Sequence, residues 1–100
     1  MPKAYNAYWV VCYRSISNAV QQESYNMLAL PAVIAAGGRY LARGNPFKTY
    51  EAGIDLRTVL IEFDSVAQAI GAYESPGHQA ALAVLGDAAE RNVRIVEGVT

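Results

Sequence analysis

The segment Arg57-Thr58-Val59-Leu60-Ile61-Glu62-Phe63 decides the fold, because it is the clearest strand in the sequence. β-Branched and aromatic residues dominate this segment, as they do in sheets. Alternation along a strand puts one set on one face, namely Val59, Ile61 and Phe63. The opposite face then carries Thr58, Leu60 and Glu62. This strand is apolar on both faces except at Glu62.

Helical signals follow this strand directly. Ser65 is expected to cap a helix, with Gln68 as its reciprocal partner three residues later. Ser75-Pro76 then restarts a helix with proline in its first turn, and Ala88 and Ala89 are expected to belong to the apolar side of that helix. The stretch from Val93 to Val99 forms the last predicted strand.

The chain before Arg57 begins with the same strand-then-helix order. Residues 8–13, Tyr-Trp-Val-Val-Cys-Tyr, are predicted to form a strand, followed by a loop over residues 15–18. Asn18 caps the first helix, with Gln21 placed to reach back to it. Pro31 predicts a kink or a restart within this helix, and Gly37-Gly38 ends it by supplying a left-handed cap.

A second strand is predicted over residues 39–44, with Tyr40 and Ala42 on the same face. Residues 48–52 are expected to continue it as a short extended segment. Residues 53–55 are expected to form a turn that leads into the strand of residues 57–63. The resulting order is βαββαβ, the ferredoxin-like arrangement. We therefore expect one α+β domain spanning residues 1–100, with a four-stranded antiparallel sheet and the helices on one face.

The composition of the chain predicts a second subunit. Hydrophobic residues make up 53% of the sequence and charged residues 17%, whereas roughly 25% is charged in average domains. The helices leave one sheet face bare, and residues 8–13 offer large apolar side chains to whichever face that is. Roughly 10 kcal/mol of apolar surface would stay in water. Two sheets packed face to face remove this cost, so we predict a homodimer through the open sheet face.

Other classes of partner are disfavoured by charge and sequence length. The net charge is −1, which predicts neither a nucleic acid nor an anionic membrane as partner. The longest apolar stretch, residues 27–36, is too short for a membrane span and contains Pro31. Cys12 is alone, so no internal disulfide can form. A cytoplasmic protein is the expectation.

Six segments together resemble the domain of unknown function 1330 family, within the dimeric α+β barrel superfamily. They are residues 1–5, residues 8–17 apart from Val11-Cys12, Gly37-Gly38-Arg39-Tyr40-Leu41-Ala42-Arg43-Gly44, residues 58–65, Ala72-Tyr73-Glu74-Ser75-Pro76 and Arg94-Ile95-Val96-Glu97-Gly98. The resemblance covers nearly the whole chain. It implies a barrel made by two back-to-back sheets in a dimer, and it implies no particular activity.

Three positions depart from the pattern of that family. Residues 6–8 look inserted, as if Ala4-Tyr5 had been duplicated, and Asn18-Ala19 stands where relatives often have Asp-Pro. His78 stands where relatives usually carry an aromatic residue, often tyrosine. A role of that position shared by the whole family is therefore in doubt for this chain.

The most favoured function is the binding of an apolar or aromatic small molecule between sheet and helices. The residues predicted to contact such a ligand are Tyr25, Arg43, Glu62, Tyr73 and His78. Glu62 lies in an apolar strand and needs a partner, for which Arg57 or Arg43 is expected. Each residue also has a purely structural reading, an ion pair for the charges and core packing for the tyrosines. A cavity of about 300 Å³ or more facing His78 or Glu62 would favour a ligand.

The alternative function is a cofactor-independent enzyme, resembling the monooxygenases or isomerases of the same superfamily. His78, the only histidine, is then the weak catalytic candidate as a general base, with Tyr25 or Tyr73 orienting substrate. No cofactor and no metal site are expected, because one histidine and one cysteine far apart give no ligand spacing. RNA binding is disfavoured because Glu62 in the third strand would repel phosphate.

Overall fold

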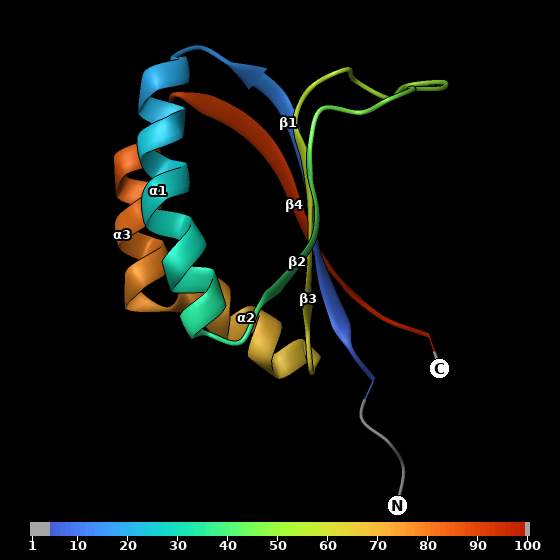
Figure 1. Cartoon of the computed structure of the whole chain (residues 1–100), viewed down its shortest axis with the longest axis vertical. Coiled ribbons are helices and arrows are strands. Elements are labelled where there is room, and N and C mark those ends of the chain that lie inside the picture. Colours follow the sequence, from blue (N-terminus) through green and yellow to red (C-terminus); the bar gives the residue numbers. More distant parts are fainter. Residues whose placement is uncertain (1–4, 100) are drawn as a thin grey trace, which may run out of the picture.

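The chain forms one antiparallel sheet with three helices packed on one of its faces (Figure 1). The computed structural model describes residues 5–99. The elements in chain order are β1 (Ala7–Ile16), α1 (Ala19–Ala35), β2 (Arg39–Gly44), β3 (Thr58–Phe63), α2 (Val66–Glu74), α3 (Pro76–Leu85) and β4 (Ala89–Glu97). The strand order across the sheet is β2-β3-β1-β4, and all neighbours are antiparallel. This is the ferredoxin-like fold that the order of strand and helix signals predicted.

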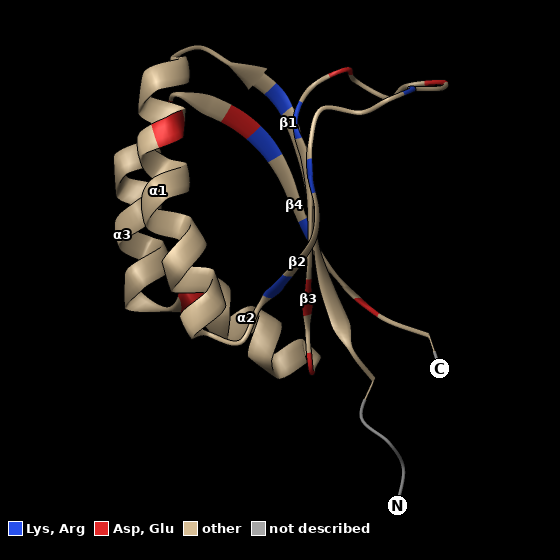
Figure 2. Cartoon of the chain, viewed as in Figure 1, with Lys and Arg blue, Asp and Glu red and all other residues tan. Residues whose placement is uncertain are grey.

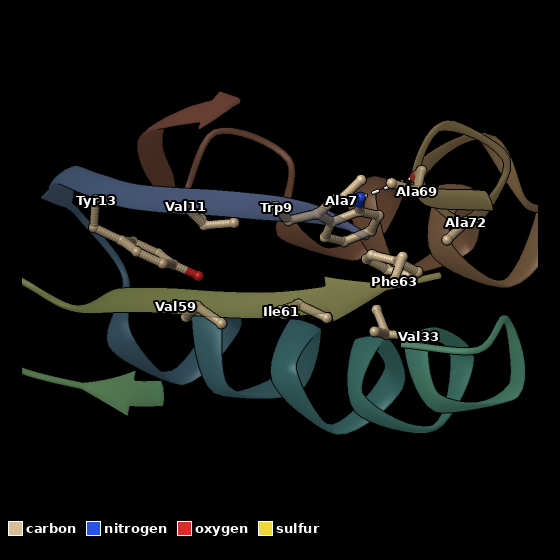
Figure 3. Packing of buried hydrophobic residues seen from close by; sticks show 10 residues of the cluster. All are labelled: Ala7, Trp9, Val11, Tyr13, Val33, Val59, Ile61, Phe63, Ala69 and Ala72. Atoms are coloured by element: carbon tan, nitrogen blue, oxygen red, sulfur yellow. Dashed lines mark hydrogen bonds between the residues drawn. The ribbon is translucent and has the colours of Figure 1, made fainter. Parts of the chain in front are cut away.

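The core lies between the sheet and the helices, and it is built from alternate residues of β1 and β3 (Figure 3). Trp9 is 2% exposed, stacks against Phe63 with ring centroids 5.2 Å apart, and donates its indole N–H to the Ala69 carbonyl at 2.9 Å. Val11, Val59 and Ile61 continue this layer toward β2. The face of β3 that carries Val59, Ile61 and Phe63 is thus the buried one.

Helix termini follow the predicted signals in part. The Asn18 side chain accepts from the Gln21 backbone N–H at 3.0 Å, but the Gln21 side chain bonds the carbonyls of Val84 and Leu85 instead of reaching back. α1 runs through Pro31 without a restart. Pro31 and Met27 are both exposed, so the Met27 carbonyl that proline leaves free can bind water. Gly37 has φ +96° and ends the helix in the left-handed region, as expected.

Several predicted boundaries differ from the structure. β4 begins at Ala89, not Val93, because Arg91 and its neighbours pair with β1 despite their polarity, and α3 ends at Leu85 before Ala88 and Ala89. β1 extends to Ile16 through an irregularity between Tyr13 and Ser15. Residues 48–52 form no strand.

An irregularity in β2 also changes which residues share a face. Tyr40 lies opposite Ile61 and Ala42 opposite Leu60, so Tyr40 and Ala42 lie on different faces of the sheet. The extra residue at Leu41 shifts the alternation by one, a consequence of β-bulges. Arg43, opposite Val59, therefore shares the helix-facing side with Tyr40.

The segment between β2 and β3 leaves the sheet on the side away from the helices (Figure 1). We call residues 45–57 the arm. Three large apolar side chains of the arm are exposed, namely Phe47, Tyr50 and Ile54. In the described part of the chain, no helix has the length and apolar character that a bilayer crossing requires.

Candidate functional site

A small cavity lies between α1 and the sheet, on the β2 side of Trp9. Its apolar walls come from Trp9, Val11, Ala29, Val33, Val59 and Ile61. Its polar walls come from Tyr13, Tyr25, Asn26, Tyr40, Arg43, Arg57 and Arg91. The cavity measures about 30 Å³, which is room for about two water molecules. It is far smaller than the expected ligand pocket.

Strand register places three arginines around this cavity. Arg43 and Arg91 occupy helix-facing positions of β2 and β4, opposite Val59 and Tyr13 respectively. Arg57 directly precedes β3, and its backbone carbonyl accepts from the Tyr13 N–H at 3.0 Å. The three cavity arginines are therefore held by the sheet and not by mobile surface segments.

Tyrosine rings support two of the cavity arginines. The Arg43 guanidinium carbon lies 5.2 Å from the centre of the Tyr40 ring. The guanidinium carbon of Arg91 lies 4.8 Å from the Tyr25 ring centre and 5.6 Å from that of Tyr13. Such cation–π contacts are worth about 0.5–2 kcal/mol each.

Within the described part of the chain, no carboxylate lines the cavity. The ion pairs found in residues 5–99 join Arg14 to Glu90, and Arg39 to Glu62 and Asp64. Figure 2 shows that the helices carry two acidic positions and no basic one, whereas the basic positions lie on the strands and the arm. The site therefore has three positive charges and no formal counter-ion among its lining residues.

Behind the cavity, Tyr25 and His78 form a buried hydrogen bond of 3.0 Å between the tyrosine hydroxyl and Nε2. His78 Nδ1 lies 3.0 Å from the Tyr73 backbone carbonyl, which can only accept, so Nδ1 carries the proton. Nε2 then accepts from the Tyr25 hydroxyl, whose oxygen accepts from Arg91 Nη1 at 3.0 Å. The donors point in one sequence, from Arg91 through Tyr25 to a neutral His78.

Burial controls the protonation of both groups. Desolvation lowers the pKa of His78 below its ordinary value, with the Tyr73 carbonyl opposing and the Arg91 charge assisting. Desolvation raises the pKa of Tyr25, partly offset by the charge and the hydrogen bond of Arg91. Both side chains are thus neutral near pH 7.

This burial predicts acid sensitivity. The unfolded chain takes up a proton on His78 near pH 6.5, before the folded chain does, so stability is complete above that pH and falls as pH drops through the lowered folded pKa. The loss is at most about 1.4 kcal/mol per pH unit. Urea unfolding at pH 7.5, 6.5 and 5.5 measures it. His78→Phe should flatten the profile over this range, and an equal slope in that variant would contradict the assignment.

The structure separates the sequence-predicted site residues into three groups. Tyr25 and Arg43 line the cavity. Tyr73 and His78 lie one layer behind it, with ring centroids 4.8 Å apart, and His78 is only 1% exposed. Glu62 lies on the opposite, open face of the sheet.

The predicted partner of Glu62 was wrong. Its carboxylate accepts from Arg39 at 3.0 Å, from Asn6 at 2.9 Å and from Tyr8 at 3.2 Å. Arg39 is directly opposite Glu62 in the β2–β3 register, whereas Arg43 and Arg57 face the cavity. The Arg39 hydrogen bond is the main cause that lowers the pKa of Glu62. Glu62 thus forms a pair on the sheet surface.

Sequence reasoning missed Arg91, Tyr13 and Asn26 as cavity residues. A signal for Arg91 was present, because residues 91, 93 and 95 share the alternation of β4. No group of three or more His, Cys, Asp or Glu side chains suited to a metal ion occurs within residues 5–99.

A family model described as domain of unknown function (DUF1330) matches residues 6–99. The chain belongs to this family. The DUF1330 match thus includes every strand and helix and all residues that line the cavity. No curated protein matches the chain.

Solved structures with the DUF1330 chain's fold share little of its sequence. The RPA0582 protein of unknown function from Rhodopseudomonas palustris is 13% identical, with a TM-score of 0.72 over 98% of this chain and 85% of that one. A dimeric ferredoxin-like protein of unknown function from Thermobifida fusca is 19% identical, with a TM-score of 0.66 over 98% and 95%. SnoaB, a cofactor-independent oxygenase from Streptomyces nogalater, is 13% identical, with a TM-score of 0.61 over 97% and 96%. These likenesses establish the fold.

Proposed function

We propose that the protein is a homodimeric domain that binds a small apolar or aromatic molecule in the cavity between α1 and the sheet. The cavity itself carries this proposal, because an apolar floor meets a wall of polar side chains that lack counter-ions. Ligand sites in proteins combine these two properties.

A groove outside the cavity adds to the space open to a ligand. It measures about 220 Å³ and is lined by Glu23, Asn26, Met27, Leu30, Arg43 and Arg57. Asn26, Arg43 and Arg57 also line the cavity, so the two spaces adjoin at these residues. A ligand would enter between α1 and β2, with one end in the cavity and its body in the groove.

The open sheet face supports the homodimer. The strand pairings place apolar side chains there from all four strands, namely Tyr8, Val10, Cys12, Ala42, Leu60 and Val96. The arm flanks this face and adds its exposed apolar side chains (Figure 1). Two copies packed through their open faces would remove this surface from water. The related Thermobifida fusca structure is described as dimeric.

Trp9 allows the ligand proposal to be tested without a label, because it is the only tryptophan and lines the cavity. Benzoate and benzamide, titrated separately, are the probes, and at least one should change the Trp9 emission saturably. Native mass spectrometry of the same samples should show two subunits with bound probe.

Ala29→Leu fills the cavity and should abolish the change, whereas Ala80→Leu on the exposed side of α3 makes the same substitution elsewhere and should preserve it. No response to either probe, or an equal response in Ala29→Leu, would reject binding in this cavity.

The second candidate function is a cofactor-independent enzyme, favoured by the Tyr25–His78 hydrogen bond. His78 does not line the cavity, so Tyr25 would contact the substrate and His78 Nε2 would orient the tyrosine hydroxyl. Oxygen uptake with a hydroxylated aromatic probe tests this activity. Uptake retained in Tyr40→Phe and lost in Tyr25→Phe would support it, while equal rates in both variants would dismiss it.

A further inference from the structure

We infer that the cavity is a receptor for the carboxylate of a small monocarboxylic acid, held by the guanidinium groups of Arg43, Arg57 and Arg91. This inference rests on the proposed ligand binding and names the chemical class of the ligand. It is argued from uncompensated charge, an unpartnered buried donor, and the shape of the adjoining space.

The charge in the cavity requires compensation. Three guanidinium groups line one space of about 30 Å³, and none of them belongs to an ion pair within residues 5–99. Like charges that share one small space repel one another, and the half-buried Arg57 and Arg91 also lose hydration, whereas Arg43 is exposed. An anion between them would reverse both costs.

Arg57 supplies an independent observation. Its Nε is buried and has no hydrogen-bond partner among residues 5–99. A buried donor without a partner is costly, and more so on a charged group. Arg57 lines both the cavity and the outer groove, so an acceptor atom at their junction would satisfy this donor.

The tyrosine rings beside Arg43 and Arg91 offer a competing explanation for the positive charge. Ring faces attract the cations, yet they accept no conventional N–H hydrogen bonds in the guanidinium plane. Arg91 uses part of its donor set on the hydroxyls of Tyr25 and Tyr13. The remaining in-plane donors of the cavity arginines are still available to a ligand.

The available space favours a carboxylate over a bulkier anion. A carboxylate is planar and presents two oxygens that match the guanidinium fork. Its two oxygens take the place of about two waters, which is what the cavity holds. The ligand body would lie in the groove against Met27 and Leu30.

Glu23 sets a limit on the rest of the ligand. It lines the outer groove and accepts from Asn26 Nδ2 at 3.3 Å. A second negative charge on the ligand body would lie close to this carboxylate and be repelled. The site should therefore prefer monocarboxylates to dicarboxylates of equal length.

The test compares matched acids and amides by Trp9 emission and by isothermal titration at constant ionic strength. Benzoate should bind about 10- to 100-fold more tightly than benzamide, the range that hydrogen bonds to charged groups provide. Butanoate should bind more tightly than succinate, and sulfate and chloride should not displace benzoate. Equal affinities for acetate and butanoate would indicate a receptor for a short free acid. Tighter binding of butanoate would indicate that the ligand body also contacts the groove.

Arg57→Gln is the decisive variant. It should weaken benzoate binding about 10- to 100-fold and weaken benzamide binding by a clearly smaller factor. Without ligand it should unfold at the same urea concentration as the parent or a higher one, because the unpartnered charge is gone. Arg14→Gln, which removes an exposed arginine paired with Glu90, is the matched control and should bind benzoate normally.

Three results would overturn the inference. Equal binding of benzoate and benzamide would leave the proposed function intact and remove the carboxylate receptor. Displacement of benzoate by sulfate or chloride would show screening of positive charge without a specific site. If neither benzoate nor benzamide changed the Trp9 emission, the ligand proposal and the inference would both be rejected.

Discussion

Leu60→Glu is expected to convert the proposed homodimer into folded monomers. Leu60 lies in the central part of the open face, opposite Val10 on β1 and Ala42 on β2. Twofold symmetry brings two new carboxylates into one interface, and removing an ion from water costs several kcal/mol. We expect at least about 100-fold weaker association, since each 1.4 kcal/mol is tenfold. Sedimentation velocity across a dilution series measures it.

Leu28→Glu is the matched control for this experiment. Leu28 is 46% exposed on α1, on the helical side of the molecule, so the same change there should leave association unaffected. If the parent protein sedimented as a folded monomer, the proposal that the open face forms a dimer interface would be rejected. A dimeric Leu60→Glu variant would place the interface on another surface.

Trp9→Ala is expected to lower the free energy of unfolding by about 3–5 kcal/mol, the usual cost of deleting a large buried aromatic. Trp9 packs against Phe63, Tyr73 and His78, and its loss also leaves the Ala69 carbonyl without its donor. The whole free energy of unfolding of a domain of this size is about 5–15 kcal/mol. Urea unfolding followed by circular dichroism gives the change without relying on tryptophan emission.

Trp9→Phe separates the two contributions. It keeps an aromatic ring in the core and removes the N–H donor, so a loss of only about 1–3 kcal/mol is expected. A loss below 1 kcal/mol in Trp9→Ala would mean that the site can collapse around the missing side chain. In that case the ring cluster around Trp9 would not be the main support of the core.

The sequence was sufficient to predict the order of elements because the strong local signals agree with the tertiary structure. Strand β3 alternates cleanly, Asn18 and Ser65 cap helices through their side chains as expected, and α3 has Pro76 in its first turn as expected. Resemblance to the family implied the same fold independently. Where local and tertiary preferences coincide, sequence patterns are reliable.

Local sequence patterns could not predict which side chains surround the cavity. Arg43 reaches the cavity side only because of the irregularity in β2, and a bulge leaves no signature in the alternation of Arg39-Tyr40-Leu41-Ala42. Arg91 was overlooked because β4 was predicted to begin after it. Its polar start, Glu90-Arg91-Asn92, is stabilised by pairing with β1 and not by intrinsic strand preference.

His78 shows how an observation on one residue can mislead. A lone histidine at a helix start suggested a base open to substrate, but its ring packs against Trp9 and Tyr73 inside the core. The residue that faces the cavity is Tyr25, whose hydroxyl lies between His78 and Arg91. Chemistry at this site would therefore begin at the tyrosine.

The arm has a mechanical consequence for the cavity. Gly44 and Thr58 pair where the arm leaves the sheet. Arg43 and Arg57 therefore lie beside this pair, at the two ends of the arm. A neighbouring subunit that bound the tip of the arm would fix the distance between Arg43 and Arg57. Assembly and ligand affinity are then linked reciprocally, and each should strengthen the other by the same factor.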